Sequence, residues 1–257
     1  EIIGYITHVD ANQMGDIVNN AAQAFESWSQ TDVATRAQVL NKTADLLEEH
    51  RDELIALCIK EAGKIPVDGV AEVREAVDFC RYYAQQARAH FTVRVLPGPT
   101  GEVNELSMDG RGLFLCISPW NFPMATAVWK IAPALAFGNS VILKPANLVP
   151  ASAWALTEII ARQTALPSGA FNLLMGSGSQ VGNTLINSDK IHAVSFTGSL
   201  PVGRQVASAT AANLVKCQLE MGSKNALIVA ADANLEVAVN AAFVGAYSGT
   251  GQKCTAS

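Results

Sequence analysis

Long runs of like charge and long apolar runs are both absent from this 257-residue sequence. Its 18 lysines and arginines stand against 23 aspartates and glutamates, a net charge of −5, without any basic cluster. A protein that tracks the phosphates of nucleic acid needs such a cluster, so we expect no nucleic-acid partner. No apolar stretch reaches the roughly 18 residues of a membrane-spanning helix, and no signal peptide is visible. We therefore expect no membrane partner either.

Paired cysteines are missing as well. The five cysteines show neither Cys-x-x-Cys nor Cys/His spacing, so neither a disulfide framework nor a metal site is expected. Free thiols favour a reducing compartment, which predicts a cytoplasmic protein. Cys58, Cys80, Cys116 and Cys217 lie in apolar periodic segments, and each is predicted to be a small core residue. Cys254 differs, because it stands in a glycine-rich loop where its sulfur would be accessible.

Acidic residues become scarce after position 110. Residues 1–110 carry 18 acidic and 9 basic side chains, whereas residues 111–257 carry 5 and 9. The first part is predicted to form an exposed, charged helical layer. The second is predicted to be mostly buried, as parallel sheets covered on both faces are, so each of its ionisable groups needs a specific reason.

Hydrophobic periodicity predicts four helices before residue 91, at about 10–28, 32–50, 52–63 and 67–90. The inward stripe of the fourth helix is predicted to contain Val70, Val73, Val77 and Cys80. Residues 91–110 alternate valines with polar residues around a Pro-Gly-Pro turn. That pattern is typical of a long hairpin, here expected to stand off the body.

From residue 111 the pattern changes to alternating strands and helices. The short apolar runs that predict strands are 113–117, 140–144, 171–175, 192–196 and 214–220. The helical stretches between them are about 122–137, 150–164, 179–187 and 200–211. This alternation predicts an α/β fold with a doubly wound parallel sheet, in which ligands bind at the carboxyl ends of the strands. The candidate residues at those ends are Asn121, Lys144, the turn 197–199 and Glu220.

Three polar groups could together carry out one reaction. Cys254 would supply a nucleophile, Glu220 a carboxylate base, and Asn121, held between two prolines, an amide donor. Covalent oxidation of an aldehyde through a thioester needs this set, because a thiol must be activated and an oxyanion stabilised. Two structural interpretations stay open: Glu220 could pair with Lys224 or solvent, and Asn121 could form a turn at a helix start.

Two glycine-rich turns, 176–182 and 197–203, could hold the phosphates of a dinucleotide. Neither is a GxGxxG fingerprint or a Walker P-loop, although Pro201 opens a helix whose amides suit a pyrophosphate. Lys144 would lie near ribose or phosphate oxygens, or else be a solvated strand-end lysine. Asn147 stands where a carboxylate would reject a 2′-phosphate, so its amide leaves NAD and NADP both open.

Taken together, the motifs resemble the aldehyde dehydrogenase superfamily. The order and approximate spacing of that family are kept by PWNFP (119–123), LKPAN (143–147), FTGS (196–199), LEMGSKN (219–225) and GQKC (251–254). The resemblance implies a Rossmann-like NAD(P)-binding domain with an N-terminal helical layer and a protruding hairpin. It also implies a homo-oligomer, dimer or tetramer, acting on a small-molecule aldehyde.

The resemblance assigns roles residue by residue. It makes Cys254 the nucleophile, Glu220 the general base and Asn121 the oxyanion donor. Lys130 becomes a proton relay toward the glutamate or the partner in a structural ion pair. The implied cofactor contacts are Ile117, Ser118, Pro119, Trp120, Lys144, Ala146, Asn147, Gly178, Gly182, Phe196, Thr197, Gly198, Ser199, Val202, Met221 and Gly222. One departure is Ser223, where the family has a second glycine, and its Cβ could shift Glu220.

Within the family, residues 121–139, 144–156 and 251–257 look most like α-ketoglutaric semialdehyde dehydrogenases, with succinic semialdehyde enzymes next. This implies NAD(P)-dependent oxidation of a semialdehyde to a carboxylic acid. The alternative is a non-catalytic dinucleotide-binding fragment, because the chain resembles only about the N-terminal half of the family. The implied parts are 1–90, the helical part of the cofactor domain; 91–110, an oligomerisation hairpin; 111–222, the Rossmann-like core; and 223–257, the start of a catalytic domain.

Overall fold

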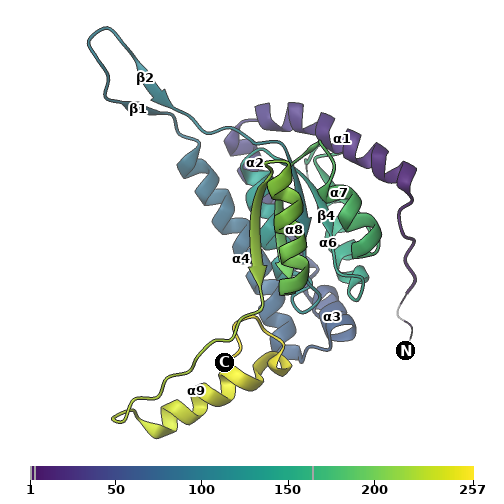
Figure 1. Cartoon of the computed structure of the whole chain (residues 1–257), viewed down its shortest axis with the longest axis vertical. Coiled ribbons are helices and arrows are strands. Elements are labelled where there is room, and N and C mark those ends of the chain that lie inside the picture. Colours follow the sequence, from purple (N-terminus) through teal and green to yellow (C-terminus); the bar gives the residue numbers. More distant parts are fainter. Residues whose placement is uncertain (1, 3, 164) are drawn as a thin grey trace.

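The computed structural model describes residue 2, residues 4–163 and residues 165–257, and it has the predicted α/β fold. A five-stranded sheet forms the centre in the order β5-β4-β3-β6-β7, and all its strand pairs are parallel. Its strands are β3 (Leu113–Ile117), β4 (Ser140–Lys144), β5 (Phe171–Leu173), β6 (Ile191–Gly198) and β7 (Lys216–Met221). The order runs outward from β3 in both directions, which is a doubly wound arrangement (Figure 1).

Helices cover both faces of this sheet. They are α1 (Ala11–Gln30), α2 (Val33–Glu49), α3 (Arg51–Ala62), α4 (Pro66–His90), α5 (Ala125–Ala136), α6 (Pro150–Gln163), α7 (Asn183–Ile186) and α8 (Leu200–Ala212). The helix α9 (Leu235–Tyr247) lies away from the sheet (Figure 1). Cys116 and Val141 point to the core shared with α2, α4, α5 and α6. Leu115 and Ile142 point to the core shared with α1, α7 and α8. Because successive strand residues face opposite sides, each apolar run serves both cores.

The four predicted N-terminal helices are confirmed, with one wrong side chain. Val70 is 41% exposed, whereas the other three residues of its predicted stripe are buried. At this end of α4 the buried face passes through Gly69 and Glu72 instead. The buried glutamate therefore replaces an apolar contact that periodicity alone would predict.

That glutamate corrects the expectation that the charged N-terminal layer is only an exposed surface. Glu72 is 1% exposed, and its Oε1 accepts hydrogen bonds from the N–H groups of Met124 and Ala125, both at 2.9 Å. The Nζ of Lys64 lies 3.0 Å from its other oxygen. The first N–H groups of a helix lack partners within the helix, and its N-terminus carries partial positive charge. Glu72 therefore accepts hydrogen bonds from the N–H groups at the start of α5 and places a negative charge at the positive end of this helix.

The other end of α5 meets a buried cation. The Nε of Arg36 donates to the carbonyl of Ala136 at 3.0 Å, and the Nε1 of Trp28 donates to the carbonyl of Leu135 at 3.1 Å. The guanidinium of Arg36 also lies 4.6 Å from the ring centroid of Phe91. A cation at a helix C-terminus complements the negative end of the helix dipole. Side chains of the N-terminal helices thus fix both ends of α5.

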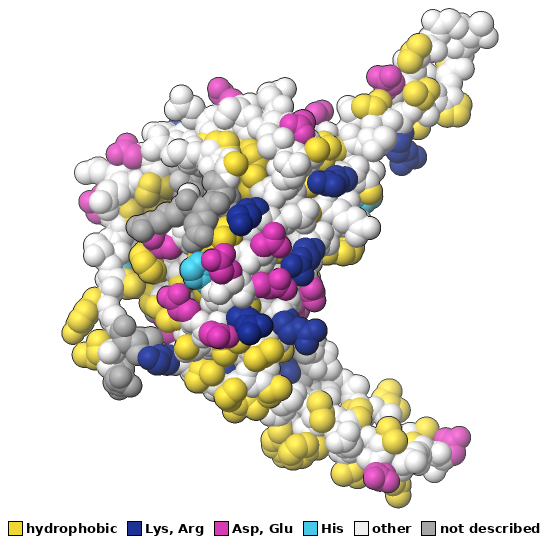
Figure 2. Space-filling view, turned by 180° about the vertical axis from the view of Figure 1, so that it is seen from behind, with side chains coloured by type: hydrophobic (Ala, Val, Ile, Leu, Met, Phe, Trp, Pro, Cys, Tyr) yellow, Lys and Arg dark blue, Asp and Glu magenta, His cyan; other side chains and the backbone are white. Residues whose placement is uncertain are grey.

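Two segments project from the body (Figure 1). β1 (Arg94–Leu96) and β2 (Asn104–Leu106) pair antiparallel, as the predicted hairpin requires. The second projection follows β7 and carries α9, every residue of which is described and none of which is buried. Its apolar side chains stay exposed, Ile228 at 88%, and Figure 2 shows hydrophobic side chains along both projections. The expectation that the second part is mostly buried is therefore wrong here. Among the described residues, no helix has the length and apolar character to cross a membrane.

Replacing Glu72 with alanine should strongly destabilise the fold, because it leaves Lys64 buried without a counter-charge. Breaking a buried ion pair from one side costs about 3–5 kcal/mol. We expect the free energy of unfolding to fall by that order in urea denaturation followed by tryptophan fluorescence. The control is Arg81→Ala, which removes exposed pairs with Asp45 and Glu48 and should cost less than about 1 kcal/mol. Equal effects of the two substitutions would contradict the anchoring role of Glu72.

Candidate active site

A cleft of about 1370 Å³ opens at the carboxyl edge of the parallel sheet. The last residues of four strands line it: Ile117 of β3, Lys144 of β4, Gly198 of β6 and Met221 of β7. Doubly wound sheets bind their ligands at this edge. The position predicted from strand order therefore coincides with a real cleft.

Most of the sequence-predicted site residues line this cleft. The catalytic candidates among them are Asn121, Glu220 and Cys254. The cofactor candidates among them are Ile117, Ser118, Pro119, Trp120, Lys144, Ala146, Gly178, Gly182, Phe196, Thr197, Gly198, Ser199, Val202, Met221 and Gly222. Two predicted residues lie elsewhere: Lys130 is buried behind the wall, and Asn147 is exposed in the turn after β4. Both glycine-rich turns border the same space, so they are two parts of one site.

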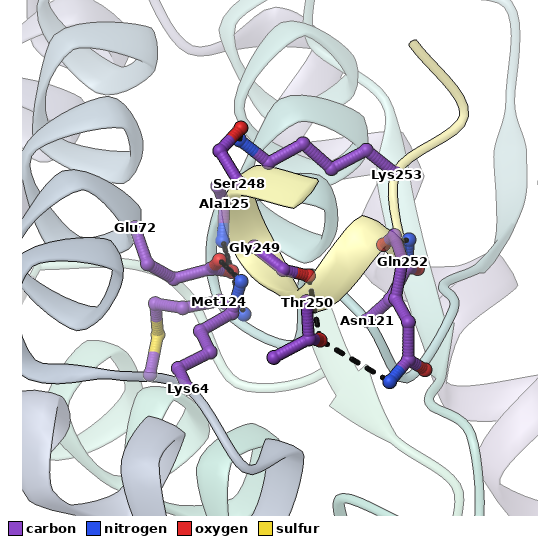
Figure 3. A network of polar contacts seen from close by, with 10 residues as sticks. All are labelled: Lys64, Glu72, Asn121, Met124, Ala125, Ser248, Gly249, Thr250, Gln252 and Lys253. Atoms are coloured by element: carbon purple, nitrogen blue, oxygen red, sulfur yellow. Dashed lines mark hydrogen bonds and ion pairs between the residues drawn. The ribbon is translucent and has the colours of Figure 1, made fainter. Parts of the chain in front are cut away.

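Asn121 is tied to the loop that carries Cys254. Its Nδ2 donates a hydrogen bond to the carbonyl of Gln252 at 2.8 Å, and Figure 3 shows the two residues side by side. Asn225 binds the same loop further on, with its Nδ2 2.8 Å from the carbonyl oxygen of Cys254. A side-chain amide has two N–H donors, so Asn121 keeps one for another acceptor. The local-turn interpretation of Asn121 does not describe this long-range contact.

The backbone just before Cys254 is unusual. Gly249, Thr250 and Gly251 have positive φ angles of 61°, 58° and 68°. A Cβ on Gly251 would lie 2.9 Å from a backbone oxygen, so glycine is required there. A β-branched threonine in this region is a strained outlier, of a kind that gathers at functional sites. The turn leaves Cys254 exposed at the cleft.

Glu220 lies on β7 with its carboxylate at the cleft wall. Its Oε1 accepts a hydrogen bond from the Nε2 of Gln218 at 3.1 Å. Within the described part of the chain it forms no ion pair with Lys224, the partner that the sequence left open. Ser223 is exposed, so its side chain has room without displacing Glu220.

Lys130 is 5% exposed, and its Nζ donates to the Oγ of Ser195 at 3.2 Å. Burial lowers the pKa of Lys130 to about 8, against the opposing influence of Cys116 and Glu220. The ion pair that the sequence left open for Lys130 does not form among the described residues. The ammonium therefore sits in the core with a hydroxyl as its hydrogen-bond partner.

Several groups at the cleft fit a dinucleotide. Among the described residues, the hydroxyl oxygens of Ser118 and Thr197 are buried without a hydrogen-bond partner, and both residues line the cleft. Buried polar atoms normally have partners, so these two fit a polar ligand. A Cβ on Gly178 or Gly182 would meet nothing within 4 Å, so glycine keeps that space open. The side chain of Ser199 does not cap α8, which leaves its first amides for an anion.

Lys144 takes part in this region differently from the sequence expectation. It is buried rather than solvated, its Nζ donates to the carbonyl of Pro145 at 2.6 Å, and burial lowers its pKa. Lys144 still lines the cleft, so its ammonium can serve a ligand there. Within the described residues no group of three or more His, Cys, Asp and Glu side chains could hold a metal ion.

Sequence reasoning missed the aromatic wall that α4 and α5 contribute. The rings of Phe79 and Trp129 stack with centroids 5.5 Å apart and planes at 5°, and Trp129 Nε1 donates to the hydroxyl of Tyr83 at 3.0 Å. Glu75 and Lys253 line the cleft nearby, and burial raises the pKa of Glu75. The four-residue spacing of Glu75 and Phe79 marks a common helix face. Nothing in that spacing tells that the face borders a cleft.

The sequence profile of the aldehyde dehydrogenase family matches residues 1–257. This chain belongs to the aldehyde dehydrogenase family. Among its relatives, α-ketoglutaric semialdehyde dehydrogenase of Bacillus subtilis (strain 168) is 40% identical over 262 residues, covering 100% of this chain and 52% of the relative. The 2,5-dioxopentanoate dehydrogenase of Saccharolobus solfataricus is 36% identical over 245 residues, with 94% and 51% covered. The chain spans about half the length of these curated relatives.

Solved structures agree with this aldehyde dehydrogenase assignment. Betaine aldehyde dehydrogenase from Staphylococcus aureus, in complex with NAD+, is 32% identical with a TM-score of 0.95, covering 100% of this chain and 51% of that one. Proline utilization A from Bdellovibrio bacteriovorus, inactivated by N-propargylglycine, is 33% identical with a TM-score of 0.97, covering 100% and 27%. The family resemblance and the fold class drawn from the sequence are both confirmed.

The five thiols of this aldehyde dehydrogenase chain should react in a definite order. Burial raises the pKa of Cys58, Cys80 and Cys116 to about 12, so these thiols stay protonated in mildly alkaline buffer. We expect iodoacetamide to alkylate the exposed Cys254 first and the half-buried Cys217 more slowly, as measured by peptide mass mapping over time. The other three should react only after unfolding. Fast labelling that persists in Cys254→Ser would contradict this order.

The stability of the protein should depend on pH through Lys130. Its native pKa of about 8 lies below the ordinary 10.5, so between these values the unfolded state binds more protons. The contribution of Lys130 to stability should therefore rise with pH across that window, by on the order of 3 kcal/mol. The buried thiols of Cys58, Cys80 and Cys116 act in the opposite direction, because their pKa is raised, so the contribution is measured as the difference from a variant that keeps these thiols. Lys130→Met lacks this contribution. Urea denaturation of both proteins at several pH values measures the difference, and parallel curves would contradict the shifted pKa.

Proposed function

We propose that the complete protein oxidises an aldehyde to a carboxylic acid through a thioester on Cys254, with NAD(P) as the hydride acceptor. The observation that carries this proposal is the 2.8 Å hydrogen bond from Asn121 to the carbonyl of Gln252, two residues before the thiol. Glu220 lines the same cleft as both residues. The match of the whole chain to the aldehyde dehydrogenase family supports the same reaction.

The residues of the chain then act in order. The carboxylate of Glu220 takes the proton of the Cys254 thiol, and the sulfur attacks the aldehyde carbon. The free N–H of Asn121 and the backbone N–H of Cys254 stabilise the oxyanion, and losing one such donor typically costs about a hundredfold or more in rate. When bound, the oxidised nicotinamide supplies the hydride acceptor that turns this adduct into a thioester. Glu220 releases the thiol proton to solvent and then takes a proton from water as the water attacks the thioester. That proton passes to the departing sulfur, which frees the carboxylic acid and restores the thiol.

NAD or NADP would occupy the part of the cleft between the two glycine-rich turns. The partnerless hydroxyls of Ser118 and Thr197 and the uncapped start of α8 support a dinucleotide with its pyrophosphate at the helix. Asn147 carries no charge that would repel a 2′-phosphate, which supports use of NADP as well. The NAD+ complex of the related betaine aldehyde dehydrogenase supports NAD.

The substrate we propose is a semialdehyde such as α-ketoglutaric semialdehyde, with succinic semialdehyde as the alternative. The names of two relatives support the first. Lys253 lines the cleft next to Cys254. Its Nζ donates to Ser248 Oγ at 3.1 Å and has two further N–H donors from which an anionic tail could accept. Reduced-cofactor formation across a panel of semialdehydes and uncharged aldehydes tests this choice. The highest kcat/KM for an uncharged aldehyde would contradict it.

We further propose that residues 223–257 begin the catalytic domain and that the 91–110 hairpin contacts another subunit of a dimer or tetramer. The exposed apolar side chains of Leu235 and Phe243 on α9 support a docking partner for the first segment. The exposed Val95 and Val103 of the hairpin support one for the second. The 257-residue chain alone would then bind a dinucleotide without turnover. By itself it would therefore be the non-catalytic dinucleotide-binding fragment that the sequence left as the alternative.

Substituting the general base in the complete protein should separate hydride transfer from hydrolysis. Glu220→Ala should still give a slow burst of about one reduced cofactor per site, while the steady-state rate falls roughly a hundredfold or more. Cys254→Ala should abolish the burst and the turnover, and the control Cys217→Ala should keep both. Stopped-flow absorbance of the reduced cofactor measures burst and steady state together. An unchanged steady-state rate in Glu220→Ala would remove the base assignment.

A further inference from the structure

A chain of hydrogen bonds joins Lys130, behind the cleft, to Glu220 in its wall. Lys130 Nζ donates to Ser195 Oγ at 3.2 Å, and Ser195 Oγ donates to Gln218 Oε1 at 2.8 Å. Gln218 Nε2 then donates to Glu220 Oε1 at 3.1 Å. The four side chains come from α5, β6 and β7. The chain thus links a buried cation to the proposed general base through two neutral residues.

The chemistry of its two ends fixes the direction of this chain. An ammonium group can only donate and an ionised carboxylate can only accept. The hydroxyl of Ser195 must therefore turn its hydrogen toward Gln218, and the amide of Gln218 must present its NH2 group to Glu220. Hydrogen bonds that point the same way polarise one another, more so inside a protein than in water. A flipped Gln218 amide would set its oxygen against the carboxylate of Glu220 and break that contact.

The backbone holds the middle of the chain in register. Ser195 and Gln218 are directly paired residues of the parallel strands β6 and β7. Gln218 and Glu220 are two residues apart on β7, so their side chains leave the strand on the same face. Only the side chain of Lys130 comes from a helix. The sheet therefore sets which side chains face one another, and the hydrogen bonds set how the exposed side chains of Gln218 and Glu220 are oriented.

A purely structural role would explain this arrangement less well. A buried ammonium needs a negative charge nearby to offset its loss of hydration. The hydroxyl of Ser195, its hydrogen-bond partner, is neutral and does not supply that charge. The titratable groups that act on Lys130 are Cys116 of β3 and Glu220 itself. The thiol of Cys116 is protonated, because burial raises its pKa to about 12. The counter-charge of the buried ammonium is therefore the carboxylate at the far end of the chain.

We propose that Ser195 and Gln218 are positioning residues for the hydrolytic step: they hold Oε1 of Glu220 at the cleft wall and leave Oε2 free to take a proton. Lys130 anchors the buried end of the chain by donating to Ser195. This inference rests on the proposed function, because it assumes that Glu220 activates water. It assigns roles to two residues that carry no motif of their own.

Two substitutions of Gln218 in the complete protein test the proposal. Gln218→Met keeps the length but removes the donor, and we expect the steady-state kcat to fall roughly tenfold, as for the loss of a hydrogen bond to a charged group. Gln218→Glu keeps the shape but sets a like charge beside Glu220. It should lower kcat further and move the acid limb of its pH profile up by about one unit. KM and the burst amplitude should stay within about twofold of the unsubstituted protein, since positioning acts on hydrolysis.

Matched variants separate positioning from general damage. Gln85→Met makes the same chemical change at an exposed position of α4 and should leave kcat and its pH profile unchanged. Ser195→Ala breaks the chain at its buried end and should lower the steady-state kcat in the same direction as Gln218→Met. If Gln218→Glu does not fold, as judged by circular dichroism, Gln218→Met and Ser195→Ala decide.

The outcomes distinguish this inference from the function on which it rests. If Glu220→Ala stalls hydrolysis while the Gln218 and Ser195 variants keep the unsubstituted kcat and pH profile, the positioning role is wrong and the proposed function stands. If Glu220→Ala itself leaves hydrolysis unchanged, the base assignment fails and the positioning role fails with it. A lowered steady-state kcat in Gln218→Met and Ser195→Ala, with the burst intact, supports both. A structural role alone would lower the burst and the steady-state rate together.

Discussion

The buried ion pair of Glu72 and Lys64 is the contact on which the geometry of the cleft depends. One oxygen of Glu72 binds the first two N–H groups at the start of α5, and Lys64 lies against the other at 3.0 Å. The same ammonium sits 4.2 Å from the ring centroid of Phe122, the neighbour of Asn121 (Figure 3 shows the surroundings). A single buried pair thus fixes both the helix and the loop that carries the amide donor. Removing either charge would leave the other uncompensated in the core.

Charged side chains of the N-terminal helices therefore hold the ends of helices that pack on the sheet. Glu61, at the end of α3, binds the start of α6 through the N–H groups of Ala151 and Ser152, at 2.8 and 2.6 Å. Arg36 binds the end of α5. Each of these groups meets a helix terminus of opposite partial charge, so the distribution of acidic residues between the two parts of the chain has a structural reason. The carboxylates that bind the starts of α5 and α6 come from residues before 110, and acidic residues are scarce after that position.

The sequence could predict a site residue only where a polar side chain stands at or just after the end of an apolar strand. Lys144 and Glu220 end or nearly end apolar runs, and parallel strands gather their carboxyl ends at one edge, so topology alone brings them together. Glu72 could not be predicted, because it binds N–H groups more than fifty positions further along the chain. Gln218 depends on the register between β6 and β7, which no local pattern encodes. The exposed α9 was misjudged because apolar composition does not tell which partner covers it.

The helix α5 is what converts these separate contacts into one site. Asn121, just before it, binds the loop of Cys254, and Lys130 within it binds Ser195 under the wall that carries Glu220. Lys130 lies in α5, whereas Asn121 lies in the turn just before its first residue, Ala125, so both contacts come from one short stretch of chain. The loop that carries Cys254 contacts the turn before α5, and the strand that carries Ser195 contacts α5 itself. The contacts of Glu72 and Arg36 hold the two ends of α5, and with it the backbone of Lys130, in place beneath the cleft.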